Sequence, residues 1–179
     1  MPKFFNPKVG ALPLSIVMFT LLMFQGSAVA QPEGGHSLTV LKNMQTDAAQ
    51  ANKLCVPMVI MVSQFSCVYC EKLREQVLLP LLKSGAFDDK ALIRELLIDP
   101  DEFVTELNGN TSTGRQVATQ YIDNIVTPTI LIIDSSGNEV VERIVGISNI
   151  DFYSAYLEKQ INTAYQKSSP GCSQDQEEK

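Results

Sequence analysis

The sequence predicts an α/β domain in which a mixed central β-sheet is flanked by helices. Strand-like runs of apolar, β-branched residues alternate along the chain with segments whose apolar residues recur at helical spacing. The last two strand-like runs are joined by a short turn. The expected order of elements is α, β, α, β, α, β, β, α. Alternation of strands with helices favours parallel pairing, and the terminal hairpin adds antiparallel pairing, so a mixed sheet is expected.

The first elements are a helix and a buried strand. Residues 37–54 carry apolar side chains on one helical face, which predicts a helix that begins at Ser37. Residues 56–62 read VPMVIMV, a continuous apolar run of the kind that strands buried on both faces show. A turn at residues 63–66 then leads into a second helix.

That second helix carries Cys67 and Cys70, and Pro80 is expected to end it and to start another short helix. Residues 91–98 (ALIRELLI) predict the next strand, and residues 113–121 predict a further helix. Residues 129–133 and 139–145, joined by DSSGN at 134–138, predict a β-hairpin.

A final helix is expected after a cap at Asn149 or Asp151, because Tyr153, Leu157 and Ile161 share one helical face. The domain is expected to span residues 37–166. Residues 167–179 form a polar tail that we expect to be disordered.

The start of the chain has the pattern of a cleaved signal peptide at residues 1–30. Lys3 and Lys8 precede an apolar run at residues 9–24, and small residues lead to a cut expected after Ala30. Residues 31–36 would then be a flexible leader, and the protein would be exported, most simply to a bacterial periplasm. Cleavage leaves 12 basic and 20 acidic side chains, a net charge of −8. An acidic chain is a poor ligand for phosphate backbones, so nucleic acid is not an expected partner.

The motif Cys67-Val68-Tyr69-Cys70 lies where the buried strand leads into a helix. A cysteine at a helix N-terminus faces unpaired N–H groups that favour the reactive thiolate. A second cysteine one turn later can attack the resulting mixed disulfide. The motif therefore predicts a redox-active pair with Cys67 as nucleophile and Cys70 as resolving thiol. A zinc site would need four ligands and would have to recruit Cys55 and Cys172, which is the weaker interpretation.

Taken with Thr127-Pro128-Thr129 before a hairpin and with DSSGNEVVERIVG at residues 134–146, the motif resembles the thioredoxin superfamily over residues 37–165. Within it the chain is similar to exported thioredoxin-like reductases. The resemblance implies a thioredoxin fold, a cis bond before Pro128, and Pro128 placed against the cysteine pair. It also implies that Thr127, Pro128, Val68 and Tyr69 contact the substrate.

The same resemblance implies protein substrates with disulfides or thiols, a membrane electron-transfer partner, and no cofactor or metal. Two departures limit it. Met61 occupies the position of the buried acid of cytoplasmic thioredoxins, and neither Val68 nor Tyr69 supplies positive charge. Glu71 and Lys72 are expected to be solvated, with little net effect on the thiolate.

These features favour a reductase. The alternatives are a disulfide oxidant or isomerase, or a thioredoxin-fold binding or chaperone module that is redox-inactive. His36, the single histidine, lies in the leader and is expected to be solvated, which argues against copper delivery. Cys55 is interpreted as a small apolar filler. Cys172 could pair with Cys55 or with another chain, and the sequence does not decide between them.

Overall fold

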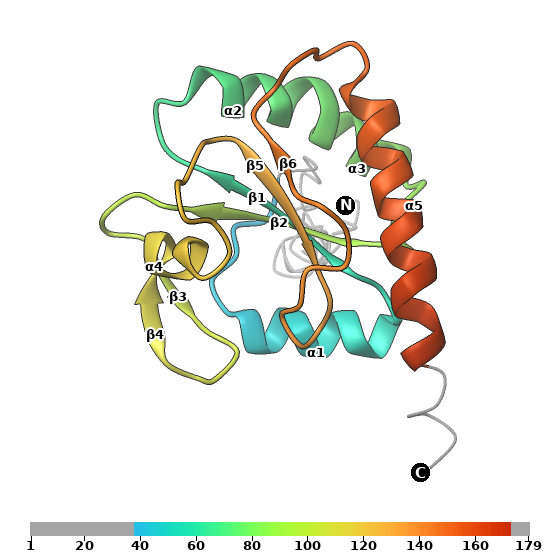
Figure 1. The fold of residues 1–179 in the computed structure, drawn as a ribbon, viewed down its shortest axis with the longest axis horizontal. Coiled ribbons are helices and arrows are strands. Elements are labelled where there is room, and N and C mark those ends of the chain that lie inside the picture. Colours follow the sequence, from blue (N-terminus) through green and yellow to red (C-terminus); the bar gives the residue numbers. More distant parts are fainter. Residues whose placement is uncertain (1–37, 173–179) are drawn as a thin grey trace, which may run out of the picture. The chain divides into compact units, whose positions relative to one another are not determined.

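A four-stranded mixed sheet forms the centre of the computed structural model, which describes residues 38–172 (Figure 1). Its strands are β1 (Met58–Ser63), β2 (Leu92–Leu97), β5 (Thr129–Ile133) and β6 (Ile144–Val145). They lie in the order β2-β1-β5-β6. β1 and β2 are parallel, β5 is antiparallel to β1, and β6 is antiparallel to β5. The predicted mixed sheet is confirmed, while the expectations for residues 1–30 and 31–36 lie outside the described residues.

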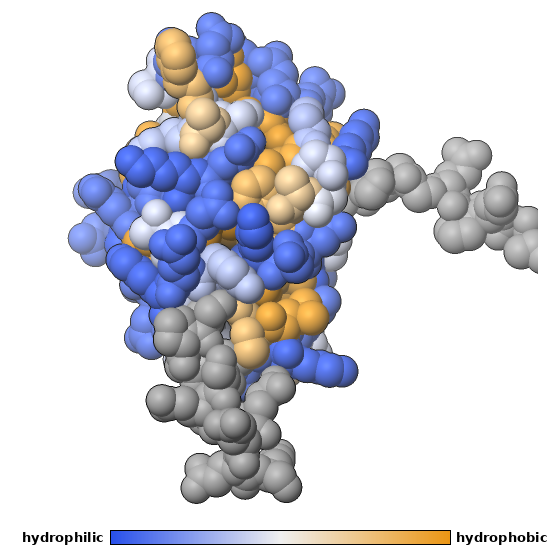
Figure 2. All heavy atoms as spheres, turned by 90° about the vertical axis from the view of Figure 1, so that its right-hand side faces the viewer, coloured by the Kyte–Doolittle hydropathy of each residue, from blue (hydrophilic) through white to orange (hydrophobic). Residues whose placement is uncertain are grey.

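Helices cover both faces of this sheet. One face holds α1 (Met44–Leu54) and α4 (Gly114–Thr119). The other holds α2 (Val68–Leu73), a π-helical turn η1 (Arg74–Leu78), α3 (Leu79–Ser84) and α5 (Tyr153–Cys172). On the side of the molecule that carries α5, hydrophilic residues surround smaller hydrophobic areas (Figure 2). None of the helices within residues 38–172 is long and apolar enough to cross a membrane.

Strand β1 is buried along its whole length, as its unbroken apolar sequence predicts. Successive side chains point to opposite faces, so Val59 and Met61 pack with α2, α3 and α5, whereas Ile60 and Val62 pack with α1 and α4. Burial of each such side chain is worth about 1.5–3 kcal/mol. β1 is therefore the rigid element on which the segment that follows it is built.

The first helix begins later than the expected Ser37. Asn43 caps α1, with its side chain accepting a hydrogen bond from the Thr46 N–H at 3.0 Å. The residues before it run extended, because Val40 makes a parallel bridge to Glu95 and Asn43 makes one to Thr105. The apolar side chains at the start of this segment thus pack from an extended chain and not from a helix.

The predicted break at Pro80 holds in part. Pro80 lies in the first turn of α3, where its missing N–H is tolerated, and Gly85 ends that helix with a φ of 66°. The chain does not leave the helical path before it, because η1 joins α2 directly to α3.

A small hairpin of β3 (Phe103–Thr105) and β4 (Thr111–Thr113) separates β2 from α4 and was not predicted. The helix expected at residues 113–121 is confirmed as the shorter α4. Thr113 and Gln116 form a capping box at its start. The strands of this hairpin are too short to show a clear alternation in the sequence.

Two expectations for the C-terminal part were wrong in extent. Only Ile144–Val145 of residues 139–145 forms a strand, although Glu139 makes an isolated bridge to Ile133. The last helix starts at Tyr153 and continues to Cys172, beyond the expected start of the tail at residue 167. Asn149 accepts a hydrogen bond from the Asp151 N–H in the turn before it. Packing of Leu157 and Ile161 in the core supports this helix.

Candidate functional site

A disulfide joins Cys67 to Cys70 where the chain enters α2, with 5.2 Å between the two Cα atoms. Cys67 is the N-cap residue of the helix, and its Sγ accepts a hydrogen bond from the Cys70 N–H at 3.1 Å. This is the environment that favours a thiolate. Cys67 is half-buried, whereas Cys70 is only 1% exposed. Cys67 is therefore the sulfur that a substrate can reach.

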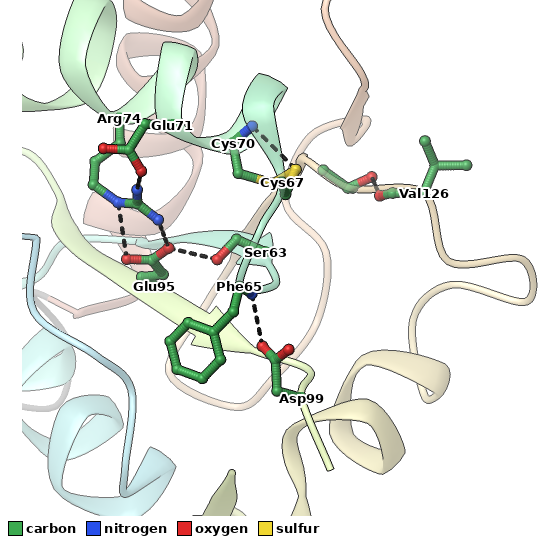
Figure 3. The surroundings of a disulfide bond; sticks show 10 residues. Ser63, Phe65, Cys67, Cys70, Glu71, Arg74, Glu95, Asp99 and Val126 are labelled. Carbon is green, nitrogen blue, oxygen red and sulfur yellow. Dashed lines mark hydrogen bonds and ion pairs between the residues drawn. A yellow bond between two sulfur atoms is a disulfide. The ribbon is translucent and has the colours of Figure 1, made fainter. Parts of the chain in front are cut away.

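Two hydrogen bonds to the residues that follow β2 hold the loop that presents Cys67. Ser63 ends β1, and its carbonyl accepts a hydrogen bond from the Ile98 N–H at 2.9 Å. The Phe65 N–H donates to the Asp99 carboxylate at 2.9 Å (Figure 3). Ser66 then takes a left-handed φ of 58°, directly before Cys67. The loop thereby holds the cysteine at the carboxyl end of the buried strand.

The rim of the disulfide is apolar and exposed. Val68 and Tyr69, the two residues inside the motif, are 78% and 63% exposed. Phe65 and Val126 are also large, exposed apolar residues, and Figure 3 places Val126 on the opposite side of the disulfide from Glu95. An apolar rim around a reactive sulfur suits contact with a protein chain.

Thr127 and Pro128 lie at the same end of the sheet as the cysteines. β5 begins beside the carboxyl end of β1, where Val62 is the register partner of Thr129. The Thr127–Pro128 peptide bond is cis. The Pro128 carbonyl accepts a hydrogen bond from the Gly146 N–H at 2.8 Å, and the Thr129 hydroxyl donates to the Val126 carbonyl at 2.7 Å. Contact between this segment and a substrate stays a prediction.

A cavity of about 640 Å³ opens beside Cys67. Apolar residues of its lining include Val40, Phe65 and Leu97, and its charged residues are Glu71, Arg74 and Glu95. Glu95 comes from β2 and is 4% exposed. The redox pair and a buried carboxylate thus share one cavity.

The buried carboxylate is held by a network that Figure 3 shows beside the disulfide. Arg74 donates to Glu95 from two nitrogens, its Nε–Oε2 distance being 3.3 Å, and also pairs with Glu71. The Ser63 hydroxyl donates to Glu95 as well. The pKa of Arg74 is raised, because its hydrogen bonds to Glu95 outweigh the lowering that burial causes. Arg74 therefore stays charged throughout the working pH range.

This network was missed from the sequence. Met61, at the position where the family resemblance implies an acid, is buried in the core. Its register partner on β2 is Glu95, so a buried acid lies one strand away. The sequence did offer one signal for this buried acid, since Glu95 lies inside the apolar run at residues 91–98. Glu71 is solvated as expected, being 57% exposed, and it also pairs with Arg74.

The remaining predicted residues lie away from this cavity or outside the described part. Cys55 follows α1 in a left-handed conformation with a φ of 57° and is itself part of a disulfide, so its interpretation as an apolar filler was wrong. His36 and the side chain of Cys172 lie outside the described residues, and the predictions for them stay predictions. Within residues 38–172, no group of three or more His, Cys, Asp or Glu side chains could hold a metal ion.

Comparison with known proteins gives one family match and a set of structural similarities. The model of a thioredoxin-like domain matches residues 43–161. Thioredoxin O2 from Arabidopsis thaliana, in its oxidised state, aligns with a TM-score of 0.47 and 18% identity over 69% of this chain and 93% of its own. A thioredoxin-like protein from Clostridium perfringens aligns with a TM-score of 0.46 and 19% identity over 80% and 94% of the two chains.

The periplasmic thioredoxin SoxS from Paracoccus pantotrophus, in its reduced form, is similar with a TM-score of 0.39 and 18% identity over 60% of this chain and 98% of its own. No curated protein matches the chain. These structural similarities all have TM-scores below 0.5 and carry no argument, so the assignment rests on the family match over residues 43–161.

Proposed function

Because this chain belongs to the thioredoxin-like family, we propose that it is an extracytoplasmic protein thiol-disulfide oxidoreductase that works as a reductase. The observation that carries the proposal is the Cys67–Cys70 disulfide at the N-terminus of α2, with one accessible and one buried sulfur. The family and the pair support thiol-disulfide exchange. The compartment and the direction of electron flow are our inference.

In the proposed reaction Cys67 is the nucleophile. Its thiolate attacks a substrate disulfide, one substrate sulfur leaves as a thiol, and a mixed disulfide forms on Cys67. Cys70 then loses its proton and attacks the Cys67 sulfur, which releases the second substrate thiol and forms the Cys67–Cys70 disulfide. Two electrons pass from the protein to the substrate. A membrane electron-transfer partner would return the pair to the dithiol.

The apolar rim supports protein substrates. Val68 and Tyr69 present uncharged, exposed side chains inside the motif, and β5 begins at the same end of the sheet as the cysteines. We propose that Thr127 and Pro128 contact an extended substrate segment there through the backbone, which would orient a disulfide without strict sequence readout.

The direction is inferred from the thiolate stabilisers. Within the motif only N–H groups and the helix terminus favour the thiolate, and an exposed helix terminus contributes about 0.3–1 kcal/mol. For a two-electron couple this is roughly 6–20 mV, small beside the separation of about 150 mV between thioredoxin and the strong periplasmic oxidant. A reduction potential near about −120 mV would replace the reductase proposal with the oxidant.

Insulin reduction driven by dithiothreitol tests the activity. We expect the wild type to turn over and Cys67→Ser to fall to background, with both proteins giving the same far-UV circular dichroism spectrum. Asp47→Asn, which changes an ion pair between α1 and β2, is the control and should match the wild type. Wild-type and Cys67→Ser rates at the same level would favour the redox-inactive binding module.

Export is tested separately. The proposal of a signal peptide predicts that protein recovered from a bacterial periplasmic fraction begins at Gln31 by N-terminal sequencing. Recovery of the uncut chain from the cytosol would contradict the extracytoplasmic assignment while leaving the exchange activity intact.

A further inference from the structure

Among the described residues, Glu95 is the one charged residue that is buried. Burial of an isolated carboxylate costs several kcal/mol, so such groups are retained when they are paired or serve the chemistry nearby. Glu95 lies in the middle of β2 and faces the cavity that Cys67 also lines. This position puts the buried charge where it can act on the redox pair.

The network around Glu95 is tied to the elements that carry the cysteines. Ser63, which donates to Glu95, is the last residue of β1 before the loop to Cys67. Arg74, which donates to it twice, begins the π-helical turn that continues α2 beyond Cys70. π-Helical turns are uncommon and occur often at functional sites. The carboxylate therefore contacts both segments that flank the disulfide.

The charges in this cavity do not balance. Arg74 is shared between Glu95 and Glu71, so one guanidinium faces two carboxylates. Cys67 is the only other titratable residue of the lining. The rest of the lining is uncharged: Val40, Gln64, Phe65, Ser66, Val68 and Leu97. Within residues 38–172, Arg74 is the only cation that lines the cavity, so no second cation of the lining offsets the second carboxylate.

We infer that Glu95 is a positioning residue that biases the Cys67–Cys70 pair toward reductant, because its buried carboxylate opposes negative charge on Cys67. This inference rests on the proposed function. The disulfide is neutral, whereas the reduced pair gains charge when Cys67 ionises, and a neighbouring carboxylate in a poorly solvated cavity disfavours that ionisation. A reduced form that is less stabilised makes a stronger reductant. Arg74 holds the carboxylate in place through two hydrogen bonds.

The experiment equilibrates the oxidised protein with glutathione. Protein disulfide and two glutathione thiols give protein dithiol and one glutathione disulfide, and the equilibrium constant follows from the fraction of protein thiols alkylated after quenching. Glu95→Gln keeps the shape and most hydrogen bonds but removes the charge. We expect the equilibrium to shift about tenfold toward the dithiol, equal to about 30 mV. The pH at which Cys67 reacts with iodoacetamide should fall.

Two further variants keep the test decisive. Glu71→Gln removes the partly exposed carboxylate of the same network and should shift the equilibrium in the same direction by a smaller factor. Asp47→Asn is the matched control: Asp47 pairs with Arg94, the neighbour of Glu95 on β2, at 3.0 Å, but lies outside the cavity. It should leave both readouts unchanged.

An equilibrium constant in Glu95→Gln that equals the wild-type value, or that moves toward the disulfide, overturns the inference. If that variant does not fold, the absence of a shift in Glu71→Gln overturns it instead. An equal shift in Asp47→Asn would also overturn it, since the effect would then follow from the loss of any carboxylate near β2 and not from one in the cavity. A wild-type pair that does not equilibrate with glutathione at all would refute the proposed function, which is a different outcome.

Discussion

Replacement of Gly114 by alanine should destabilise the domain because the added carbon has no space. Gly114 begins α4, is buried, and donates its N–H to the Glu102 carbonyl at 2.8 Å. A Cβ on Gly114 would lie 1.9 Å from the Leu97 carbonyl oxygen and 3.0 Å from the Leu97 carbonyl carbon. These are backbone atoms of β2, so no side-chain rotation relieves the contact.

The cost follows from the distance that must be opened. An ordinary carbon–oxygen contact starts near about 3.3 Å, so α4 and the end of β2 must separate by roughly 1.4 Å. Overpacking of this kind costs about 1–3 kcal/mol, and a rigid strand backbone belongs at the upper end. The better helix propensity of alanine returns about 0.5–1 kcal/mol. We expect a net loss of about 2–2.5 kcal/mol, which lowers the melting temperature by about 10 °C.

Urea denaturation followed by far-UV circular dichroism measures this loss on the oxidised protein. Gly146→Ala is the control, because Gly146 has a φ of 66° but a Cβ added there would meet nothing within 4 Å. Only backbone strain of about 1 kcal/mol is therefore expected from the control. The reasoning fails if Gly114→Ala costs less than about 1 kcal/mol, or no more than Gly146→Ala.

Cys70→Ser should accumulate mixed disulfides between Cys67 and partner proteins on non-reducing gels, since the resolving thiol is gone; bands that require Cys70 instead would reverse the assigned roles. Thr113→Ala should cost about 1 kcal/mol in urea denaturation because it removes the cap of α4, and an unchanged midpoint would contradict the capping box. Tyr153→Phe should be neutral or stabilising by about 1 kcal/mol, because the buried Tyr153 hydroxyl has no hydrogen-bond partner. Burial also raises the pKa of Tyr153 above its unfolded value of about 10. The contribution of the neutral phenol is therefore complete below about pH 10 and is lost as pH rises toward the folded pKa, so the variant should lose less stability in alkali; equal alkaline losses would refute this.

The redox pair was predictable because its chemistry is local. Cys67 and Cys70 are one helical turn apart after a continuous apolar strand, and that pattern alone places one sulfur at a helix N-terminus. The central strands were predictable for a similar reason. β1 and β5 are buried on both faces, and strands of this kind are recognised by an almost continuous apolar sequence. Local signals failed where pairing with a distant segment decides the conformation, as at residues 38–43, which run extended because Val40 bridges to Glu95.

The α/β class, the position of the cysteine pair and the order of the main helices and strands follow from the amino-acid sequence, because each depends on the spacing of neighbouring residues. The burial of Glu95 in the cavity beside Cys67, in contrast, became visible in the packed domain. Its role depends on the parallel register that pairs it with Met61, and on Arg74 reaching it from another element. The sequence of a strand does not show which neighbouring element a charged side chain will contact. The contacts of Glu95 are set by the pairing of β2 with β1 and by the position of Arg74 in the helical segment after Cys70.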